Sequence, residues 1–317
     1  MKIAFIYDDQ NDYCISNRLE YADFCLEDEA SLIINSLKQL GHKVYVIKGI
    51  PNLKKNILDL TKIDFVFNKT EGYKSRNREG LIPAICEVFG VPYSGTDSYG
   101  FSLSLNKYHT KLIANNIKIP TPNFCLIENE CDYYKINNLR FPVIIKPNCE
   151  GSSMGCEVFY ENNSNLLTSI GNLLKKYQQP VLVEEYISGI DISVPILGTG
   201  NAAQCLGIVE FSNSDGTYPE IASTKFKYID HYITSILHRE PHTEEIIRGY
   251  SLAIYKALGC KDYGRIDFRL NGNTPYFLEI NPLPTLCENG AFDICAKTIG
   301  LNMVKIIERI IESALIS

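Results

Sequence analysis

The first 94 residues alternate between short apolar runs and one amphipathic stretch, and this alternation constrains the fold more than any other feature. Apolar runs at residues 3–7, 44–47 and 65–67 have the length of β-strands, and residues 30–40 have the apolar spacing of a helix. Strands separated by a helix that can cover a sheet face form parallel sheets. The sequence therefore predicts an N-terminal parallel α/β domain over residues 1–95.

The rest of the chain predicts two further lobes. Residues 103–115 have the pattern of one helix, and apolar strands follow at residues 141–146 and 181–187. Beyond these strands the chain is rich in short strands up to a terminal amphipathic helix. We expect a central lobe at residues 96–185 and a C-terminal lobe at residues 186–317.

The composition favours a small-molecule enzyme. The 317 residues are 45% hydrophobic with a net charge of −6, whereas nucleic acids and anionic membranes select for clustered positive charge. No apolar run approaches the roughly 20 residues that cross a bilayer, and the first strand does not resemble a secretory signal. The sequence has eleven cysteines but no Cys-x-x-Cys pair, which favours free thiols over disulfides or a metal site. We expect a cytoplasmic protein with neither a nucleic-acid nor a membrane partner.

A polar constellation near the C-terminus carries the clearest chemical signal. Two apolar strands flank the turn at residues 271–273, which is typical of a β-hairpin. Alternation along the strands places Arg265 and Asp267 on one face, and Glu279 and Asn281 on one face of the partner strand. Hard cations such as Mg²⁺ prefer oxygen ligands that they share with phosphates. The hairpin is therefore a candidate magnesium-nucleotide site, with Arg265 facing the transferred phosphoryl group; solvated charges on an exposed hairpin are the alternative.

A small-residue loop between two predicted strands is a candidate phosphate cradle. It reads Gly151-Ser152-Ser153-Met154-Gly155, and backbone N–H groups with two hydroxyls can clamp phosphate oxygens. Small-residue turns are also common without any ligand. Lys107 and Lys146 are further candidate partners for phosphates, although each alone has the ordinary surface lysine as its alternative.

These features, taken in their order and spacing, resemble the D-alanine–D-alanine ligase family of ATP-grasp enzymes from about residue 64 to the C-terminus. The resemblance implies an α/β (α+β) ATP-grasp fold with three lobes, and ATP with two Mg²⁺ ions as cofactors, Mn²⁺ being the alternative ion. The matching stretches are Gly90-Val91-Pro92-Tyr93-Ser94-Gly95, Asn106-Lys107, Thr110-Lys111, Phe141-Pro142-Val143-Ile144-Ile145-Lys146-Pro147, residues 150–155, Val183-Glu184, Gly189-Ile190-Asp191, Arg265-Ile266-Asp267 and Glu279-Ile280-Asn281.

The same resemblance implies roles for individual residues. The phosphates of ATP would lie against Lys107, Lys146, Ser152 and Ser153, and the ribose against Asp191. The adenine would lie against the strand end formed by Glu184, Glu185, Tyr186 and Ile187, and the Mg²⁺ ligands would be Asp267, Glu279 and Asn281.

Family members also close a loop with a Lys-Tyr pair over the site, and residues 224–228 are similar to that loop. This similarity implies that Lys227 reaches the γ-phosphate and that Tyr228 lies near the catalytic Ser152. Closure would exclude water from a reactive intermediate. An ordinary polar loop is the alternative.

Two segments depart from the family pattern at its amino-acid end. Residues 7–13 replace a Gly-Gly-x-Ser-x-Glu segment that holds the first amino acid, so no residue here is assigned to that glutamate. Residues 282–288 read Pro-Leu-Pro-Thr-Leu-Cys-Glu in place of Thr-Ser-Pro-Gly-Met-Thr. The loop at residues 68–79 is also unlike the family loop and is either a source of charges for a different acceptor or a solvated surface loop. We expect retained chemistry with changed substrates.

The resulting hypothesis is an ATP-dependent carboxylate–amine ligase. It would join two amino acids, or an amino acid and another amine, through an acyl phosphate, and it would release ADP and phosphate. A divergent cell-wall D-alanine–D-alanine ligase is the first alternative. A nucleotide-binding protein without turnover is the second, although the full set of polar groups on the hairpin argues against it. The expected partners are amino acids and ATP, and a homodimer is left open.

Overall fold

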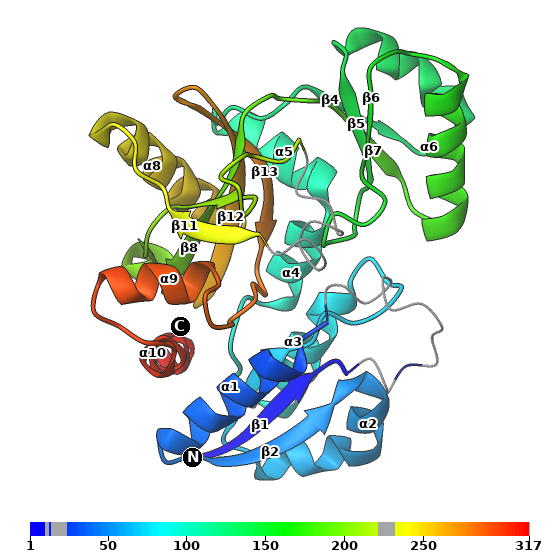
Figure 1. Ribbon diagram of the computed structural model, residues 1–317. Helices are drawn as coiled ribbons and strands as arrows, with labels where there is room; N and C mark the ends of the chain where they lie inside the picture. The colour runs from blue at the N-terminus through cyan, green and yellow to red at the C-terminus, as the bar shows by residue number, and fades with distance from the viewer. Residues whose placement is uncertain (10–12, 14–23, 221–231, 317) are drawn as a thin grey trace.

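The computed structural model describes residues 1–9, 13, 24–220 and 232–316, apart from the side chains of residues 54–58. In these ranges the strands form three sheets, each in a different part of the molecule (Figure 1). None of the described helices is long and apolar enough to cross a membrane. The ten cysteines in these ranges are free, as the sequence predicts.

The first sheet confirms the predicted parallel α/β unit. Its strands are paired in the order β2-β1-β3, all parallel. The central strand β1 and the edge strand β3 are almost entirely buried, as expected where both faces of a sheet are covered, whereas β2 at the other edge is largely exposed. The strands are β1 (Lys2–Tyr7), β2 (Lys43–Lys48) and β3 (Phe65–Lys69).

Helices from both ends of the chain cover this sheet. One face shares a core with α1 and α10, which pack against each other; the other face shares a core with residues of α2, η3 and α3. Figure 1 shows the blue N-terminal sheet and the red C-terminal helix close together. The helices are α1 (Glu27–Gln39), α2 (Gly49–Asn56), η3 (Ile57–Lys62), η4 (Arg78–Gly80), α3 (Leu81–Phe89) and α10 (Met303–Ile316).

The second sheet is antiparallel, with the order β4-β7-β5-β6, and the helix α6 packs on it. Three of its strands contribute buried Val and Ile side chains to one core with the apolar face of α6. Its elements are β4 (Phe124–Ile127), η5 (Glu130–Asn138), β5 (Val143–Pro147), β6 (Glu157–Phe159), α6 (Ser164–Tyr177) and β7 (Val181–Glu185).

The third sheet has the order β11-β10-β8-β12-β13, with β9 paired to β8. The strands β12 and β13 form the predicted hairpin, with a register shift after Asp267. Helices α8 and α9 pack on this sheet. Its elements are β8 (Ile190–Leu197), η6 (Gly200–Ala202), β9 (Gln204–Cys205), β10 (Val209–Ser212), β11 (Ile233–Ile236), α8 (Pro241–Ala257), β12 (Tyr263–Asn271), β13 (Thr274–Asn281) and α9 (Ala291–Thr298).

The single helix predicted at residues 103–115 is wrong, because the structure has two helices, α4 (Ser98–Leu105) and α5 (Lys107–Asn116). Asn106 between them has an extended backbone, with φ −86° and ψ 94°. Its side chain accepts a hydrogen bond from the backbone N–H of His109 at 3.0 Å, which makes it the N-cap of α5. Both helices pack against β13 of the third sheet. The lobe boundaries at residues 95 and 185 stay predictions.

Asp262 joins three segments that are far apart in the sequence at one buried point, where only 1% of the residue is exposed. Its carboxylate accepts hydrogen bonds from the backbone N–H of Gly95 at 2.9 Å and from the hydroxyls of Thr199 and Ser313 at 3.0 and 2.9 Å. Burial raises the pKa of Asp262 from 3.8 to about 6, although these hydrogen bonds lower it.

We expect the buried carboxyl of Asp262 to make stability fall as the pH rises. Between pH 3.8 and about 6 the folded chain holds a proton that the unfolded chain has released, so this stabilising contribution is complete below pH 3.8 and lost above 6. Urea unfolding at pH 4 and pH 7 gives the difference between the free energies of unfolding of the wild type and of Asp262→Asn. This difference, wild type minus variant, should be about 2 kcal/mol smaller at pH 7 than at pH 4. An equal difference at both pH values would contradict this account. Asp59→Asn, at an exposed carboxylate, is the control.

Candidate active site

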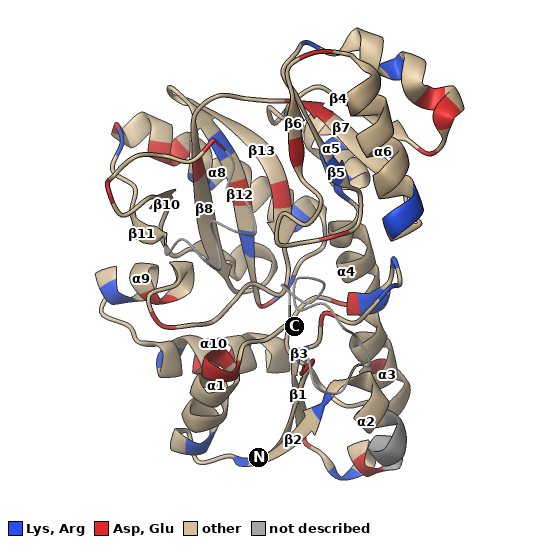
Figure 2. Ribbon diagram, turned by 45° about the vertical axis from the view of Figure 1, so that its right-hand side comes forward, with Lys and Arg blue, Asp and Glu red and all other residues tan. Residues whose placement is uncertain are grey.

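A cavity of about 360 Å³ lies where the three sheets approach one another, and it contains most of the residues singled out from the sequence. Strands β5, β7, β8, β12 and β13 line it, together with the loop at residues 150–156. Side chains from the start of α1 and the end of β3 close its other end. In Figure 2, basic positions on β5 and α5 and acidic positions on β12 and β13 lie in this central region.

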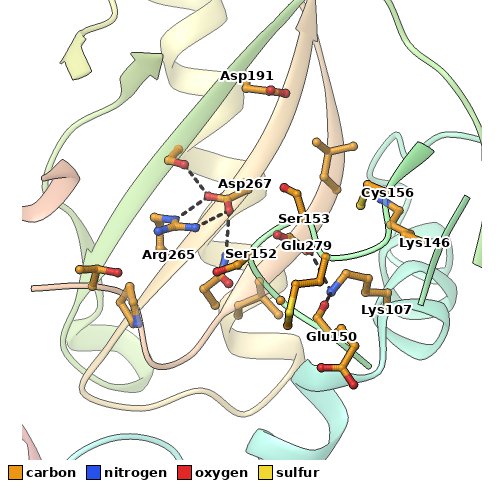
Figure 3. A pocket seen from close by; sticks show the side chains of 18 of the residues that line it. Lys107, Lys146, Glu150, Ser152, Ser153, Cys156, Asp191, Arg265, Asp267 and Glu279 are labelled. Atoms are coloured by element: carbon orange, nitrogen blue, oxygen red, sulfur yellow. Dashed lines mark hydrogen bonds and ion pairs between the residues drawn. The ribbon is translucent and has the colours of Figure 1, made fainter. Parts of the chain in front are cut away.

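The hairpin brings together the four polar side chains predicted to converge (Figure 3). Asp267 pairs with Glu279 across the strands, and Arg265 with Asn281. The guanidinium of Arg265 donates from Nε and Nη2 to the two oxygens of Asp267, at 2.8 and 2.7 Å. Asn281 Nδ2 donates to the same carboxylate at 2.8 Å. Burial alone would lower the pKa of Arg265, but Asp267 outweighs it and raises the pKa, so this arginine stays charged.

The second carboxylate of the hairpin has its own cation. Glu279 Oε2 lies 3.0 Å from Nζ of Lys107, whose ammonium also donates to the carbonyl of Glu150 in the small-residue loop. Lys107 is 8% exposed, and its position as the first residue of α5 aims its side chain across the cavity. Lys107 thus links the hairpin to the loop.

The donor set suits a hard divalent cation that shares its shell with phosphate. Two carboxylates and one amide oxygen are available from Asp267, Glu279 and Asn281, and oxygen ligands are those that Mg²⁺ prefers. Within the described ranges, no cluster of three or more His, Cys, Asp or Glu side chains could hold a metal by itself. An ion bound at the hairpin therefore needs further oxygens, such as those of phosphate groups, to complete its shell.

A buried carboxylate between two lysines defines the next part of the cavity wall. Glu184 on β7 is 1% exposed, and it pairs with Lys111 of α5 at 2.8 Å and with Lys146 of β5. Burial raises the pKa of Glu184, but the two lysines together lower it below its ordinary value. Burial lowers the pKa of Lys111 to about 8, whereas for Lys146 the attraction of Glu184 prevails and the pKa is raised. Lys146 is thus the more firmly charged of the two.

The small-residue loop has the backbone of an anion cradle. Ser152 and Ser153 have φ values of 48° and 58°, and Gly155 has 70°, so three of its residues adopt left-handed conformations. Such turns point successive N–H groups toward one side, where they can surround an anion. In Figure 3 this loop carries both serines over the hairpin, between Asp267 and the two lysines Lys107 and Lys146. A phosphate chain in the cavity would meet these groups from opposite sides.

Arg269 organises the far end of the cavity, and the sequence argument missed it. It lies directly opposite Asp191 on β8 and contacts that carboxylate at 2.8 Å. Its other nitrogens donate to the carbonyl of Ile187 at 3.0 Å and to the hydroxyl of Tyr186 at 2.9 Å. The signal was available, since Arg269 follows Asp267 by two residues and alternation places both on one face.

The sequence also predicts Glu185, Lys227 and Tyr228 as site residues. Glu185 lines the cavity, yet its carboxylate accepts hydrogen bonds from Asn123 Nδ2 at 3.0 Å and from the backbone N–H of Arg140 at 2.9 Å. Lys227 and Tyr228 lie outside the described residues, and their roles stay predictions.

The loop at residues 68–79 contributes Lys69, Glu71 and Glu79 to the cavity wall, whereas Lys74, Arg76 and Asn77 between them are exposed. Arg78 and Glu79 are each 5% exposed, and Arg78 Nη1 donates to the carbonyl of Cys149 at 2.7 Å. Asp8, in the first departing segment, is fully buried and accepts a hydrogen bond from the backbone N–H of Gly72 at 2.7 Å. Burial raises the pKa of Asp8 to about 6, although hydrogen bonds from Tyr13 and Gly72 lower it. Asp8 therefore holds this loop in place.

Comparison with known proteins agrees with this architecture. The family model described as "D-ala D-ala ligase C-terminus" matches residues 113–312. The D-alanine–D-alanine ligase of Aquifex aeolicus is 30% identical over 280 residues, which cover 88% of this chain and 92% of that protein. The uncharacterised protein y4sG of Sinorhizobium fredii is 30% identical over 296 residues, covering 90% and 87% of the two chains.

Among solved structures, the D-alanine–D-alanine ligase of Bacillus anthracis complexed with ATP shares the fold. The two structures superpose with a TM-score of 0.80 at 22% identity, over 99% of this chain and 97% of the other. The fold predicted from the sequence is thus confirmed, and so is the family resemblance. The chain belongs to the D-alanine–D-alanine ligase family of ATP-grasp enzymes, which are ATP-dependent carboxylate–amine ligases.

Proposed function

We propose that this ligase joins amino-acid substrates other than two D-alanines. The observation that carries the proposal is the contrast between the two ends of the cavity. The nucleotide end has the charged groups that ATP requires, whereas the amino-acid end is lined by residues of the departing segments 68–79 and 282–288. Asp8, from the departing segment at residues 7–13, holds the first of these through Gly72. A phosphate-release screen over pairs of D- and L-amino acids, with ATP and Mg²⁺, tests the proposal.

In the proposed reaction, the carboxylate of one substrate attacks the γ-phosphate of ATP, and an acyl phosphate forms as ADP leaves. The amine of the second substrate then attacks the acyl carbon, and phosphate departs. Lys146 and Arg265 are charged at neutral pH and are close enough to the cavity to offset charge on the transferred group. Mg²⁺ held by Asp267, Glu279 and Asn281 would supply additional charge neutralisation. Positioning and electrostatics suffice, so no covalent nucleophile is needed.

The remaining nucleotide contacts are assigned by the same proposal. Lys107 and the hydroxyls of Ser152 and Ser153 would bind the phosphates, and Asp191 would accept hydrogen bonds from the ribose. The backbone at Tyr186 and Ile187 would hold the adenine. Lys227 and Tyr228 are proposed to close over the reacting groups, and two Mg²⁺ ions are proposed to bind. The protein is proposed to act in the cytoplasm, and whether it forms a homodimer is a question for measurement.

A divergent cell-wall D-alanine–D-alanine ligase is the second candidate. The named relative from Aquifex aeolicus favours it, since that protein is a D-alanine–D-alanine ligase. Activity with D-alanine as the only amino acid would distinguish this candidate from the first.

Removing a carboxylate from the hairpin should abolish turnover and leave the fold intact. We expect Asp267→Asn and Glu279→Gln each to reduce phosphate release at least 100-fold at saturating Mg²⁺, since each removes a charged ligand from an ion that neutralises the triphosphate. Circular dichroism should match the wild type. The control is Glu308→Gln, which breaks an exposed ion pair with Lys305 on α10. Near-normal phosphate release in either hairpin variant would refute the metal assignment.

Replacing Arg269 should weaken ATP binding more than it slows the reaction. Arg269→Met removes the donors that hold Asp191, the carbonyl of Ile187 and the hydroxyl of Tyr186, and hydrogen bonds with charged groups contribute about 1.5–3 kcal/mol each. We expect the KM for ATP to rise about tenfold or more in steady-state kinetics. Arg239→Met, at a partly exposed arginine with a loose 3.9 Å ion pair, is the control. An unchanged KM for ATP would show that Arg269 does not organise the nucleotide end.

D-Alanine alone should be a poor substrate. A site whose polar groups are arranged for one substrate penalises another that leaves those groups unpaired, often by about 10⁴-fold in rate. Steady-state phosphate release with D-alanine and ATP should therefore give a kcat/KM well below about 10⁴ M⁻¹s⁻¹, the lower end for ordinary enzymes. A value at or above that level would favour the cell-wall candidate instead.

A further inference from the structure

The segment that follows Asn281 has no regular structure to hold it. No helix or strand covers the residues between Asn281 and Ala291, and Pro282 and Pro284 lack backbone N–H groups. Carbonyls buried in such a segment need donors from elsewhere in the protein. Pro282, Thr285 and several other residues of this segment line the cavity next to the hairpin. We call residues 282–290 the acceptor loop.

Two buried charges from the N-terminal domain supply the missing partners. Lys69 at the end of β3 donates from Nζ to the carbonyls of Leu283 and Pro284, at 3.2 and 2.9 Å. Glu29 in the first turn of α1 accepts a hydrogen bond from the backbone N–H of Leu286 at 2.7 Å. The two charges also contact each other at 3.1 Å, and both side chains are 3% exposed.

The ammonium of Lys69 has three N–H donors, and these contacts give it three acceptors: two carbonyls and Glu29. Although burial lowers the pKa of Lys69, the attraction of Glu29 and other nearby groups outweighs burial and raises it, so the residue is charged at neutral pH. A lysine with its donors engaged in this way cannot also bind a substrate carboxylate without giving up a contact. Its role is therefore to position the loop.

The geometry points to Lys69 and Glu29 as a positioning pair that fixes the acceptor loop and thereby sets the affinity for the amino-acid substrates. This inference rests on the proposed function, since it concerns the amino-acid end of that cavity. The nucleotide end is held by other contacts, those of Glu184 and Arg269, and these do not involve the pair. Losing the pair should therefore affect the two ends of the cavity differently.

Steady-state kinetics of Lys69→Met test the inference. With the substrate pair found in the amino-acid screen, we expect the KM for an amino-acid substrate to rise at least tenfold and the KM for ATP to change less than twofold. Lys69→Arg, which keeps the charge and the donors, should recover part of the loss. A merely structural role would lower the thermal midpoint without separating the two KM values, so an equal change in both, or none, overturns the inference.

Leaving Glu29 buried without Lys69 could unfold the protein, because an unpaired buried charge is costly. The double variant Lys69→Met with Glu29→Leu removes both charges and avoids this cost, and it should show the same separation of KM values. The matched control is Lys62→Met, which breaks the exposed Lys62–Asp59 pair in the same domain. Its KM values should equal those of the wild type.

A measurement that needs no substrate distinguishes the positioning role of the pair from the proposed function of the enzyme. Hydrogen–deuterium exchange of the Leu286 amide should be at least tenfold faster in the double variant than in the wild type, because its acceptor on Glu29 is gone. Unchanged exchange overturns the positioning role whether or not a substrate pair has been found. If the wild type releases no phosphate with any amino-acid pair, the proposed function fails, while the exchange rate still decides the role of the pair.

Discussion

The charge balance around Glu184 is the constraint on which the nucleotide end depends. A carboxylate that is 1% exposed is tolerated only with close cations, and its two lysines come from a helix and from a neighbouring strand. The helix α5 also packs on β13 of the third sheet. Lys111, which pairs with Glu184 and donates to the carbonyl of Phe277 on β13, thus links this buried charge to the third sheet.

The sequence predicted what depends on short-range pattern. Alternation and turn residues are local, so the parallel sheet, the hairpin and the placement of Arg265 and Asp267 on one strand face followed from the residues themselves. The break between the two helices at Asn106 could not be predicted in this way, because an asparagine is tolerated inside a helix as well as at its start. In the structure Asn106 also accepts a hydrogen bond from Asn148, about forty residues away, which no local pattern indicates. The role of the Lys69–Glu29 pair could not be predicted from the sequence either, since the carbonyls that Lys69 contacts lie more than 200 residues later in the chain.

The two ends of the cavity are held by different kinds of structure. Strands and a helix carry the charged residues of the nucleotide end, so their directions are set by regular hydrogen bonding. The end proposed for the amino acids consists largely of loop residues that follow β3 and β13, and Asp8, Arg78 and the Lys69–Glu29 pair hold these loops through single side chains. Substitutions at a few positions can reshape such an end without disturbing the strands that position the nucleotide. This division of structure is what the proposed change of amino-acid substrates requires.

The packing of α10 on α1 has a consequence for how the protein is made. Ile3 and Phe5 of β1 share a core with Ile306 and Ile310 of α10, so one face of the first sheet is completed by residues that are synthesised long after it. Contacts across nearly the whole chain form slowly, because the intervening segment must be ordered before they are gained. During synthesis the part of this apolar face that α10 covers therefore stays exposed until α10 has been made, and apolar surface exposed in this way favours aggregation.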